Sequence, residues 1–308
     1  MPTVSRSLLS SDEIASVVES GYGVTVIDCV LLRSLVNDVY RVTCVDDAYV
    51  VKLYQYGRWS SDAVDWELRL TERLAAHDIA APRLLLTRSG SRFGVVAAPE
   101  GQRVFAVTRL LVGETPSYTA ATYREFGLLL AGFHTAAEGI EHSPQRRLDP
   151  VASIRSVVPE VLPLLTEPDR SLVADLATTA ERRLDDARLT MGVRHGDVSL
   201  DNLVRIGEGL ALYDFDSSGH GPVAADFTGV AATEHWEAFL SGYRSSRLVT
   251  EDDLAALPWL SVVASVENLR FHLIDKAAWR GTQSREEGWV ASELDSLRAA
   301  GRRLMNRE

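Results

Sequence analysis

Short hydrophobic runs dominate the first third of the chain and give way to a helical spacing in the rest. Five runs are rich in β-branched and aromatic residues, and they span 24–32, 39–45, 49–54, 82–87 and 103–111. Such runs favour strands, because branched and aromatic side chains pack well on a pleated surface. We therefore expect an antiparallel five-stranded sheet, with a loop at 90–101 between its last two strands.

Two helices are predicted within this strand-rich part. Ser10 and Glu13 match a capping box ahead of an apolar pattern, which indicates a short opening helix. A longer helix is expected at 61–77, with Ser61 as its cap. Its inward arc consists of Val64, Leu68, Leu70, Thr71, Leu74 and Ala75. Glu67 falls in the middle of that arc.

A carboxylate on the buried face of a helix needs a partner, because an unpaired buried charge is costly. Lys52 lies 15 residues before Glu67, on the preceding strand. Of the 32 basic residues only Lys52 and Lys276 are lysine, which indicates positions that require a compact ammonium group. We predict an ion pair between Lys52 and Glu67. The alternative is a glutamate that reaches solvent at the helix edge.

Helical periodicity dominates from Thr119 onward. Apolar residues recur on one face after Thr119, and another helix carries Leu172, Leu176 and Leu184. Prolines interrupt the chain between these two helices, at positions 144, 150, 159, 163 and 168. The last segment, 233–308, is expected to be helical. A small sheet followed by a larger helical part is the expected order.

A tight hairpin interrupts this helical pattern. The apolar runs 203–206 and 210–213 flank a Gly-Glu-Gly turn, so their outer ends should meet side by side. Asn202 and Asp214 stand at those ends and should lie about 5 Å apart. Asp197 precedes Asn202 in the loop that leads into the hairpin. An amide oxygen and a carboxylate at this spacing suit Mg²⁺, which leaves its other positions to water and phosphate.

These residues also carry a resemblance. His195-Gly196-Asp197, Asn202 and Asp214-Phe215-Asp216 resemble the catalytic loop and metal-binding motif of the aminoglycoside phosphotransferase and choline kinase family, small-molecule relatives of protein kinases. The resemblance implies that Asp197 is the catalytic base and that Asn202 and Asp214 hold Mg²⁺ on the phosphates of ATP or GTP. Gly196 replaces an arginine of protein kinases, and no A-P-E motif follows. A small hydroxylated acceptor is therefore favoured over a protein.

The same resemblance implies an α+β, bilobal protein-kinase-like fold. Its N-lobe, 1–108, would hold the small antiparallel five-stranded sheet with one helix and bind the nucleotide. A hinge at 109–113 would connect it to a larger, mainly α-helical C-lobe at 114–308, which would contain the catalytic loop, the metal site and the acceptor-binding helices. ATP and Mg²⁺ would bind between the lobes.

The family's other site residues are carried over position by position. Lys52 and Glu67 match the pair that holds the nucleotide phosphates. Backbone groups near Arg109 and Leu111 would meet the adenine edge. The connection 33–38 falls where a loop covers the phosphates; it has no glycine, so Ser34 or backbone amides would serve, and a plain turn is the alternative. Three residues match structural positions of the family, namely His134, His195 and Asp226.

Several polar and aromatic residues are candidates for acceptor binding. They are Asp201, Asp216, Glu267, Asp275, Glu234, Glu237, Trp236, Trp279 and Trp289. Exposed carboxylates are usually solvated surface groups, which is the alternative for each of them. An aminoglycoside-like or other hydroxylated antibiotic is the leading acceptor, which would make the chain an antibiotic-resistance enzyme. A metabolite such as homoserine, choline or a sugar is the alternative.

Composition bears on the partners of the protein and on where it works. The net charge of −11 argues against nucleic-acid binding and permits cationic acceptors. Cys29 and Cys44 lie in strand-like runs, as expected for reduced core residues of a cytoplasmic protein. Residues 1–20 resemble neither a signal peptide nor a membrane anchor. A monomer and a homodimer both remain open.

Two functions from other classes are alternatives to a kinase. The Asp214-Phe215-Asp216 triplet could be the nucleophile motif of a haloacid-dehalogenase-type phosphatase, but that motif normally opens a chain of alternating strands and helices, and here only helices follow. An inactive kinase-like binding module would be expected to have lost a catalytic position. Lys52, Asp197, Asn202 and Asp214 are all present.

Overall fold

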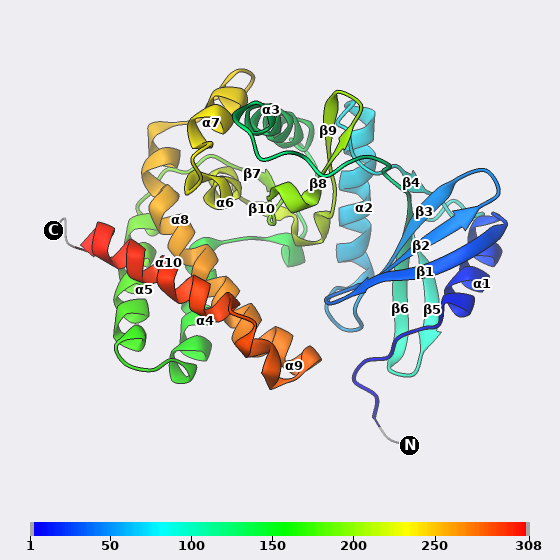
Figure 1. The fold of residues 1–308 in the computed structure, drawn as a ribbon, viewed down its shortest axis with the longest axis horizontal. Helices are drawn as coiled ribbons and strands as arrows, with labels where there is room; N and C mark the ends of the chain where they lie inside the picture. The colour runs from blue at the N-terminus through cyan, green and yellow to red at the C-terminus, as the bar shows by residue number, and fades with distance from the viewer. Residues whose placement is uncertain (1–2, 306–308) are drawn as a thin grey trace.

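The computed structural model describes residues 3–305 and places an antiparallel sheet beside a larger helical part (Figure 1). The sheet has six strands in the order β1-β2-β3-β6-β4, and β5 also pairs with β6. This first part of the chain contains α1 (Ser11–Tyr22), β1 (Val26–Ser34), β2 (Asp38–Cys44), β3 (Ala48–Leu53), α2 (Ser61–Ala76), β4 (Leu84–Leu85), β5 (Gly94–Ala98) and β6 (Gly101–Arg109). The predicted opening helix and its Ser10 cap are confirmed, because the Ser10 hydroxyl accepts a hydrogen bond from the Glu13 amide.

The prediction of five strands is wrong by one. Strand β5 lies inside the stretch that we expected to be a loop, and it pairs with β6 from Gly94↔Phe105 to Ala98↔Gly101. Its sequence is a glycine, two valines and two alanines, so it carries only a weak strand signal. The segment forms a strand because its backbone pairs with β6, although its residue types favour a strand only weakly.

Helix α2 lies against the sheet and confirms the predicted buried face. Glu67 is only 3% exposed, in the middle of that face. Trp66 is buried beside it, which the predicted arc did not include. The cap is Ser60 and not Ser61, because the Ser60 hydroxyl accepts a hydrogen bond from the Ala63 amide at 3.2 Å.

The second part is mainly helical. Its α-helices are α3 (Ala120–Ala136), α4 (Pro150–Val161), α5 (Asp169–Asp185), α6 (Thr228–Ala231), α7 (Trp236–Arg244), α8 (Glu251–Arg270), α9 (Lys276–Arg280) and α10 (Trp289–Leu304). Two short strand pairs lie among them, β7 (Met191–Arg194) with β10 (Gly219–Pro222) and β8 (Leu203–Ile206) with β9 (Gly209–Leu212). Short helical turns link these elements at Pro144–Arg146, Leu162–Leu164, Leu200–Asn202, Phe215–Ser217, Val223–Phe227, Phe271–Asp275 and Thr282–Glu286.

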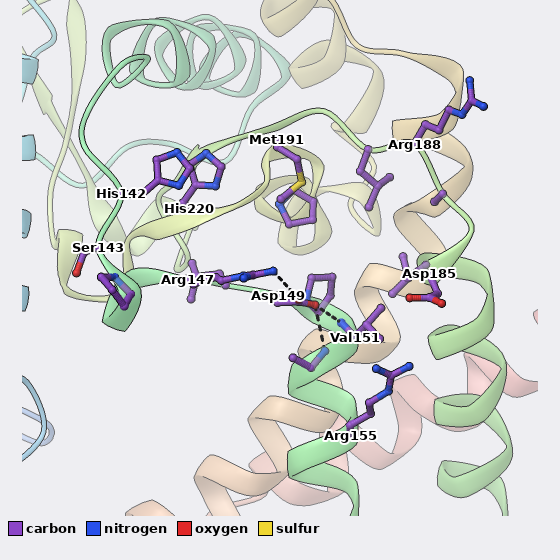
Figure 2. A pocket seen from close by; sticks show the side chains of 18 residues that line it. His142, Ser143, Arg147, Asp149, Val151, Arg155, Asp185, Arg188, Met191 and His220 are labelled. Atoms are coloured by element: carbon purple, nitrogen blue, oxygen red, sulfur yellow. Dashed lines mark hydrogen bonds and ion pairs between the residues drawn. The ribbon is translucent and has the colours of Figure 1, made fainter.

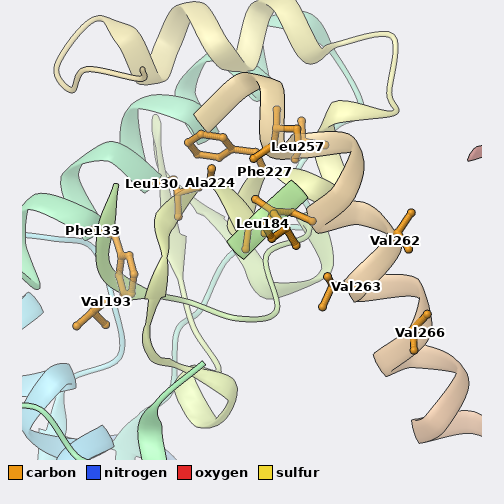
Figure 3. Close-up of a cluster of buried hydrophobic side chains, with 14 of the residues drawn as sticks. Leu130, Phe133, Leu184, Val193, Ala224, Phe227, Leu257, Val262, Val263 and Val266 are labelled. Carbon is orange, nitrogen blue, oxygen red and sulfur yellow. The ribbon is translucent and has the colours of Figure 1, made fainter. Parts of the chain in front are cut away.

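A continuous hydrophobic core holds the helical part together (Figure 3). Leu130 and Phe133 of α3 reach it from one side, and Leu257 and Val266 of α8 reach it from another. Val193 of β7 lies in the same cluster. The strand that leads into the loop 194–197 is therefore anchored in the core, which fixes the position of that loop.

Backbone hydrogen bonds hold the segment that links the two parts at both of its ends. After β6, the Leu110 amide donates to the Ala48 carbonyl at 2.9 Å, and Glu114 then exchanges hydrogen bonds with Arg205 of β8 at 3.0 and 2.8 Å. Gly113 permits this approach, because a Cβ atom there would lie 2.1 Å from the Arg205 carbonyl oxygen. Within residues 3–305, the helices lack the length and apolar character that a membrane span requires.

Candidate active site

The β8–β9 hairpin forms as the sequence predicts. Leu203 pairs with Leu212, and the Tyr213 amide donates to the Asn202 carbonyl at 3.1 Å, so Asp214 is the next residue along. The Asn202 side chain is buried, and its Nδ2 donates to Asp197 Oδ2 at 3.0 Å and to the Asp197 carbonyl at 2.7 Å. Asp197, Asn202 and Asp214 therefore converge at the open end of the hairpin.

Asp226 supports the catalytic-loop segment from behind. Its carboxylate accepts the backbone amides of His195 at 2.6 Å and Gly196 at 2.9 Å, and it contacts His134 Nε2 at 3.1 Å. Burial alone would raise the pKa of Asp226, but the hydrogen bond from His134 and the nearby Arg194 hold that pKa below its usual value. Asp226 thus connects His134 of α3 to the backbone of the loop at His195, and the structural roles that the resemblance implies for these three residues stay predictions.

Gly196 lets the loop turn. Its φ of +86° is a conformation that glycine adopts without strain. A Cβ atom at this position would lie 2.2 Å from the Ser217 carbonyl oxygen. The requirement for glycine thus has a local cause.

Asp214 has an unusual backbone conformation, and its side chain binds two cations. Its φ of +68° is rare for a residue with a side chain and costs about 1–2 kcal/mol. Lys52 Nζ lies 3.0 Å from Oδ1, and Arg33 donates to Oδ2. Burial alone would raise the pKa of Asp214, but the charges of Lys52 and Arg33 and their hydrogen bonds keep that pKa far below its usual range. Asp214 is therefore a carboxylate.

Lys52 and Glu67 form the predicted pair. Lys52 Nζ lies 3.1 Å from Glu67 Oε1, and the Tyr54 hydroxyl donates to the same oxygen at 2.9 Å. Burial would lower the pKa of Lys52, but Asp214, Asp216 and Glu67 together raise it well above its usual value. Lys52 is therefore a fixed cation that links the sheet to the hairpin.

A third partner of Glu67 comes from the helical part and was missed from the sequence. Arg146 is buried, and its Nη2 donates to Glu67 Oε2 at 2.9 Å. It also donates to the carbonyls of Ala63, at 3.1 Å, and of Asp216. Its guanidinium lies 4.1 Å from the centre of the Trp59 ring. One arginine thus ties α2 to the segment beyond Asp214.

Two cavities meet at these residues. The smaller cavity, of 380 Å³, lies between the sheet and the hairpin and is lined by Lys52, Glu67 and apolar side chains such as Val50 and Phe215. The larger cavity, of 1060 Å³, is lined by Asp197, Asp216 and residues of α4 and α8. Arg33 and Asp214 are the two residues that line both. Their ion pair therefore lies on the boundary between the cavities.

A third cavity of 1020 Å³, the side cavity, lies behind the turn that leads into α4 (Figure 2). Arg147 points toward Asp149 there, and Asp149 caps α4 by accepting the amides of Val151 and Ala152. The rings of His142 and His220 are in contact, with centres 3.8 Å apart and planes tilted by 35°. Lys52, Asp197, Asn202 and Asp214 are absent from its lining.

Only some of the residues predicted to contact the nucleotide line a cavity. Arg109 and Leu111 line the smaller cavity, while the Arg109 guanidinium pairs with Asp47 at 2.5 Å. Ser34 is turned away from both cavities, because its hydroxyl donates to Asp38 at 2.6 Å. The expected phosphate contact of the Ser34 side chain therefore gains no support from its position.

The candidate acceptor residues separate in the same way. Asp216 and Glu267 line the larger cavity. Asp201 is exposed, and Asp275 pairs with Arg270 at 2.6 Å; neither belongs to the lining of the two cavities. Trp236 packs against Phe227 and Phe239, while Glu234, Glu237, Trp279 and Trp289 are absent from the same linings. Sequence reasoning missed other lining residues, namely Arg33, Asn37, Arg58, Trp59, Arg147 and Arg194.

Asn202 and Asp214 fit a magnesium ion. Because Asn202 Nδ2 faces Asp197, its Oδ1 is left for a cation, and the Asp214 carboxylate is ionised. Oxygen ligands of this kind, few in number, suit Mg²⁺ when phosphates supply further ligands. Residues 3–305 contain no group of three or more His, Cys, Asp or Glu side chains that could hold a metal by themselves. A bound nucleotide would have to complete the site.

Comparison with known proteins shows which family the chain belongs to. A family model described as "Phosphotransferase enzyme family" matches residues 29–260. The chain belongs to this family. It is 34% identical over 274 residues to an uncharacterized protein of Deinococcus radiodurans, covering 82% of this chain and 79% of the relative. A homoserine kinase of Methylobacterium nodulans is 27% identical over 250 residues, 74% of each chain.

The fold agrees with solved structures of the same kind. An amicoumacin kinase, hAmiN, in complex with AMP-PNP, Ca²⁺ and Ami matches with a TM-score of 0.75 and 16% identity, over 94% of this chain and 93% of that chain. This match confirms the predicted kinase-like fold, and the family confirms the predicted small-molecule phosphotransferase. The acceptor is a separate question.

Proposed function

We propose that this phosphotransferase moves the γ-phosphoryl group of Mg·ATP to a hydroxyl group of a small molecule. The observation that supports it most strongly is the convergence of Lys52, Asp197, Asn202 and Asp214 where the two cavities meet. One cavity would hold the nucleotide and the other the acceptor. Phosphoryl transfer needs its reactants aligned across such a boundary.

The smaller cavity suits the nucleotide. Apolar side chains from the sheet and from the hairpin line opposite walls, including Val39, Val50 and Phe215. The backbone at 109–111 borders it, where peptide groups can meet a purine edge. In this proposal 1–108 forms the nucleotide-binding lobe, 109–113 the hinge and 114–308 the acceptor-binding lobe. ATP is the proposed donor and GTP the alternative.

Lys52 would bind the nucleotide phosphates, with Glu67 holding its ammonium group in place. Asn202 Oδ1 and the Asp214 carboxylate would hold Mg²⁺. When bound, the magnesium ion supplies charge neutralisation for the phosphate oxygens. Asp214, one of the two residues that would hold the ion, lies next to Lys52.

Asp197 would act on the acceptor. Its Oδ2 is held by Asn202, which leaves Oδ1 free to accept a hydrogen bond from the acceptor hydroxyl. The hydroxyl oxygen forms the new bond to the γ-phosphorus, and the bond from that phosphorus to the bridging oxygen of ADP breaks. The hydroxyl proton passes to Asp197 Oδ1. ADP and a phosphate monoester are the products.

The larger cavity is lined by hydrogen-bond donors and positive charge. Trp59 Nε1 is buried without a hydrogen-bond acceptor among the described residues, and Trp59 lines this cavity. Arg194 also lines it, with its Nε 3.6 Å from Asp226 Oδ1, and Arg58 adds an exposed positive charge. A buried donor without an acceptor is costly, so a ligand group that accepts a hydrogen bond would satisfy Trp59 Nε1. The acceptor should therefore carry an anionic or carbonyl group near its hydroxyl.

Negative charge on the same lining would hold an amine. The Glu267 carboxylate accepts a hydrogen bond from Ser153 and keeps its other oxygen available, whereas Asp149 is already engaged by Arg147 and the α4 amides. A small hydroxy amino acid meets both requirements, and homoserine is the acceptor in the name of the Methylobacterium nodulans relative. The net charge of −11 favours the other candidate, an aminoglycoside-like antibiotic.

Release of ADP from Mg·ATP in the presence of candidate acceptors tests the proposal. The panel contains homoserine and other hydroxy amino acids, amino alcohols without a carboxylate, sugars and aminoglycosides. We expect turnover with a hydroxy amino acid, weak turnover with the matching amino alcohol, and turnover lowered about 10²- to 10⁴-fold in the Asp197→Asn variant. Turnover confined to aminoglycosides would contradict the acceptor assignment. ADP release that no acceptor increases would contradict the whole proposal.

A further inference from the structure

We propose that Arg33 is a catalytic residue that exchanges one partner for another during the reaction. Without nucleotide it binds the Asp214 carboxylate, and with Mg·ATP bound it leaves Asp214 and binds the transferred phosphoryl group. The inference rests on the proposed function and adds a residue to it. The resemblance to the family assigned no role to Arg33.

The position of Arg33 is the first argument. It lies near the end of β1, at the start of the connection 33–38, and reaches Asp214 in the helical part. Arg33 and Asp214 are the two residues shared by the linings of the smaller and larger cavities. A phosphoryl group that passes from a nucleotide in one cavity to a hydroxyl in the other must cross this boundary. The Arg33 guanidinium already stands there.

The second argument is that Arg33 can leave Asp214 and Lys52 cannot. The Arg33 side chain is 55% exposed, and Asp214 is its one ion-pair partner among the described residues. The Lys52 side chain is 16% exposed and also contacts Glu67 at 3.1 Å and Asp216 at 3.8 Å. When a cation takes an oxygen of Asp214, the weakly held guanidinium is the group that is displaced. An arginine fork then matches the oxygens of a phosphate.

The third argument is that the other polar side chains of the connection 33–38 already have hydrogen-bond partners. The Ser34 hydroxyl donates to Asp38, which is fully buried. Asn37 donates to Asp216 at 2.7 Å and accepts the Gln55 amide at 3.1 Å. The segment contains no glycine that would let its backbone wrap closely around phosphate. Arg33 is thus the remaining side chain of the segment that could bind a phosphoryl group.

The test compares Arg33→Met with a matched control, Arg41→Met. Arg41 lies on the neighbouring strand β2, is partly exposed, and pairs with Asp28 at 3.7 Å, outside the linings of the two cavities. Calorimetry measures the binding of Mg·ADP and Mg·AMP-PNP to the wild-type protein and both variants. Turnover with the acceptor identified in the panel is measured in parallel. Melting temperatures without nucleotide verify that each variant is folded.

The inference predicts different effects on the binding of the two nucleotides. In Arg33→Met, Mg·AMP-PNP should bind about 10- to 100-fold more weakly, because a charge-assisted contact to the terminal phosphate is lost. Mg·ADP should bind as well as in the wild type or a few-fold more tightly, because no guanidinium competes for Asp214. Turnover should fall about 100-fold or more. Arg41→Met should match the wild type throughout.

Equal changes for both nucleotides, or no change for either, would overturn the role of Arg33. That outcome leaves the proposed function intact if the wild-type protein still binds Mg·AMP-PNP and phosphorylates an acceptor. If the wild-type protein binds neither nucleotide in the presence of Mg²⁺, the proposed function fails, and the role of Arg33 fails with it.

Discussion

Replacement of Arg146 by methionine should destabilise the protein more than replacement of any exposed arginine. The buried Arg146 guanidinium contacts Glu67, the Ala63 carbonyl and the Asp216 carbonyl, and it lies over the Trp59 ring. Methionine has a similar length and leaves Glu67 with Lys52 and Tyr54 alone. One oxygen of a buried carboxylate then loses its cationic partner.

The magnitude follows from the burial of the pair. Removing one partner of a buried ion pair costs about 3–5 kcal/mol. With an unfolding entropy of about 2.1 cal/mol/K per residue, a chain of 308 residues has about 0.65 kcal/mol/K. The melting temperature should therefore fall by about 5–8 °C. Turnover should fall as well, because Glu67 would no longer hold Lys52 in a fixed position.

The assay is thermal unfolding of Arg146→Met beside Arg155→Met. Arg155 lies on α4 and pairs with Glu181 at 2.8 Å, but its side chain is mostly exposed. Its replacement should change the melting temperature by no more than about 1 °C. A melting temperature for Arg146→Met within 1 °C of the control would refute the view that Arg146 fixes Glu67 and α2.

Three further outcomes are expected. Lys52→Arg should keep the fold and lose about 100-fold in turnover, because a planar guanidinium cannot occupy the place of a compact ammonium. Wild-type turnover in this variant would contradict the requirement for an ammonium group at position 52. Asp197→Asn should lose about 10²- to 10⁴-fold in turnover with nucleotide affinity unchanged, whereas Asn202→Ala should be partly restored by extra Mg²⁺; the reverse pattern would invert the two roles. Burial lowers the pKa of His134 below its usual 6.5, although its contacts with Asp226 oppose the shift. Unfolded chains therefore bind a proton that folded His134 does not, so stability should fall as the pH drops below about 6.5, and denaturant titrations should show a flatter pH dependence in His134→Gln.

Features that depend on local spacing could be predicted from the sequence. The β8–β9 hairpin follows from two apolar runs around a glycine turn, and it brings Asn202 beside Tyr213, the residue before Asp214. The Lys52–Glu67 pair follows from a charged residue inside an apolar helical arc and a lysine in a chain with almost no lysine. Each signal lies within about 20 residues and therefore leaves a pattern in the sequence.

Contacts across the two parts left no such pattern. Arg33 lies 181 residues from Asp214, and Arg146 lies 79 residues from Glu67. Both are arginines, the basic residue that the chain uses almost everywhere, so neither stands out by type. Strand β5 was missed for another reason, because its small residues depend on pairing with β6 to form a strand.

The magnesium-dependent thermal shift tests the central claim most directly. A nucleotide at 100 times its dissociation constant adds about 2.7 kcal/mol of stability, which corresponds to about 4 °C for this chain. The wild-type protein should show this shift with Mg·AMP-PNP and a smaller shift with AMP-PNP alone. Asp214→Asn should lose the part of the shift that depends on Mg²⁺, but AMP, which lacks the phosphates that Mg²⁺ would contact, should still raise its melting temperature. A wild-type response that is independent of Mg²⁺, or an undiminished magnesium response in Asp214→Asn, would contradict the assignment of the site.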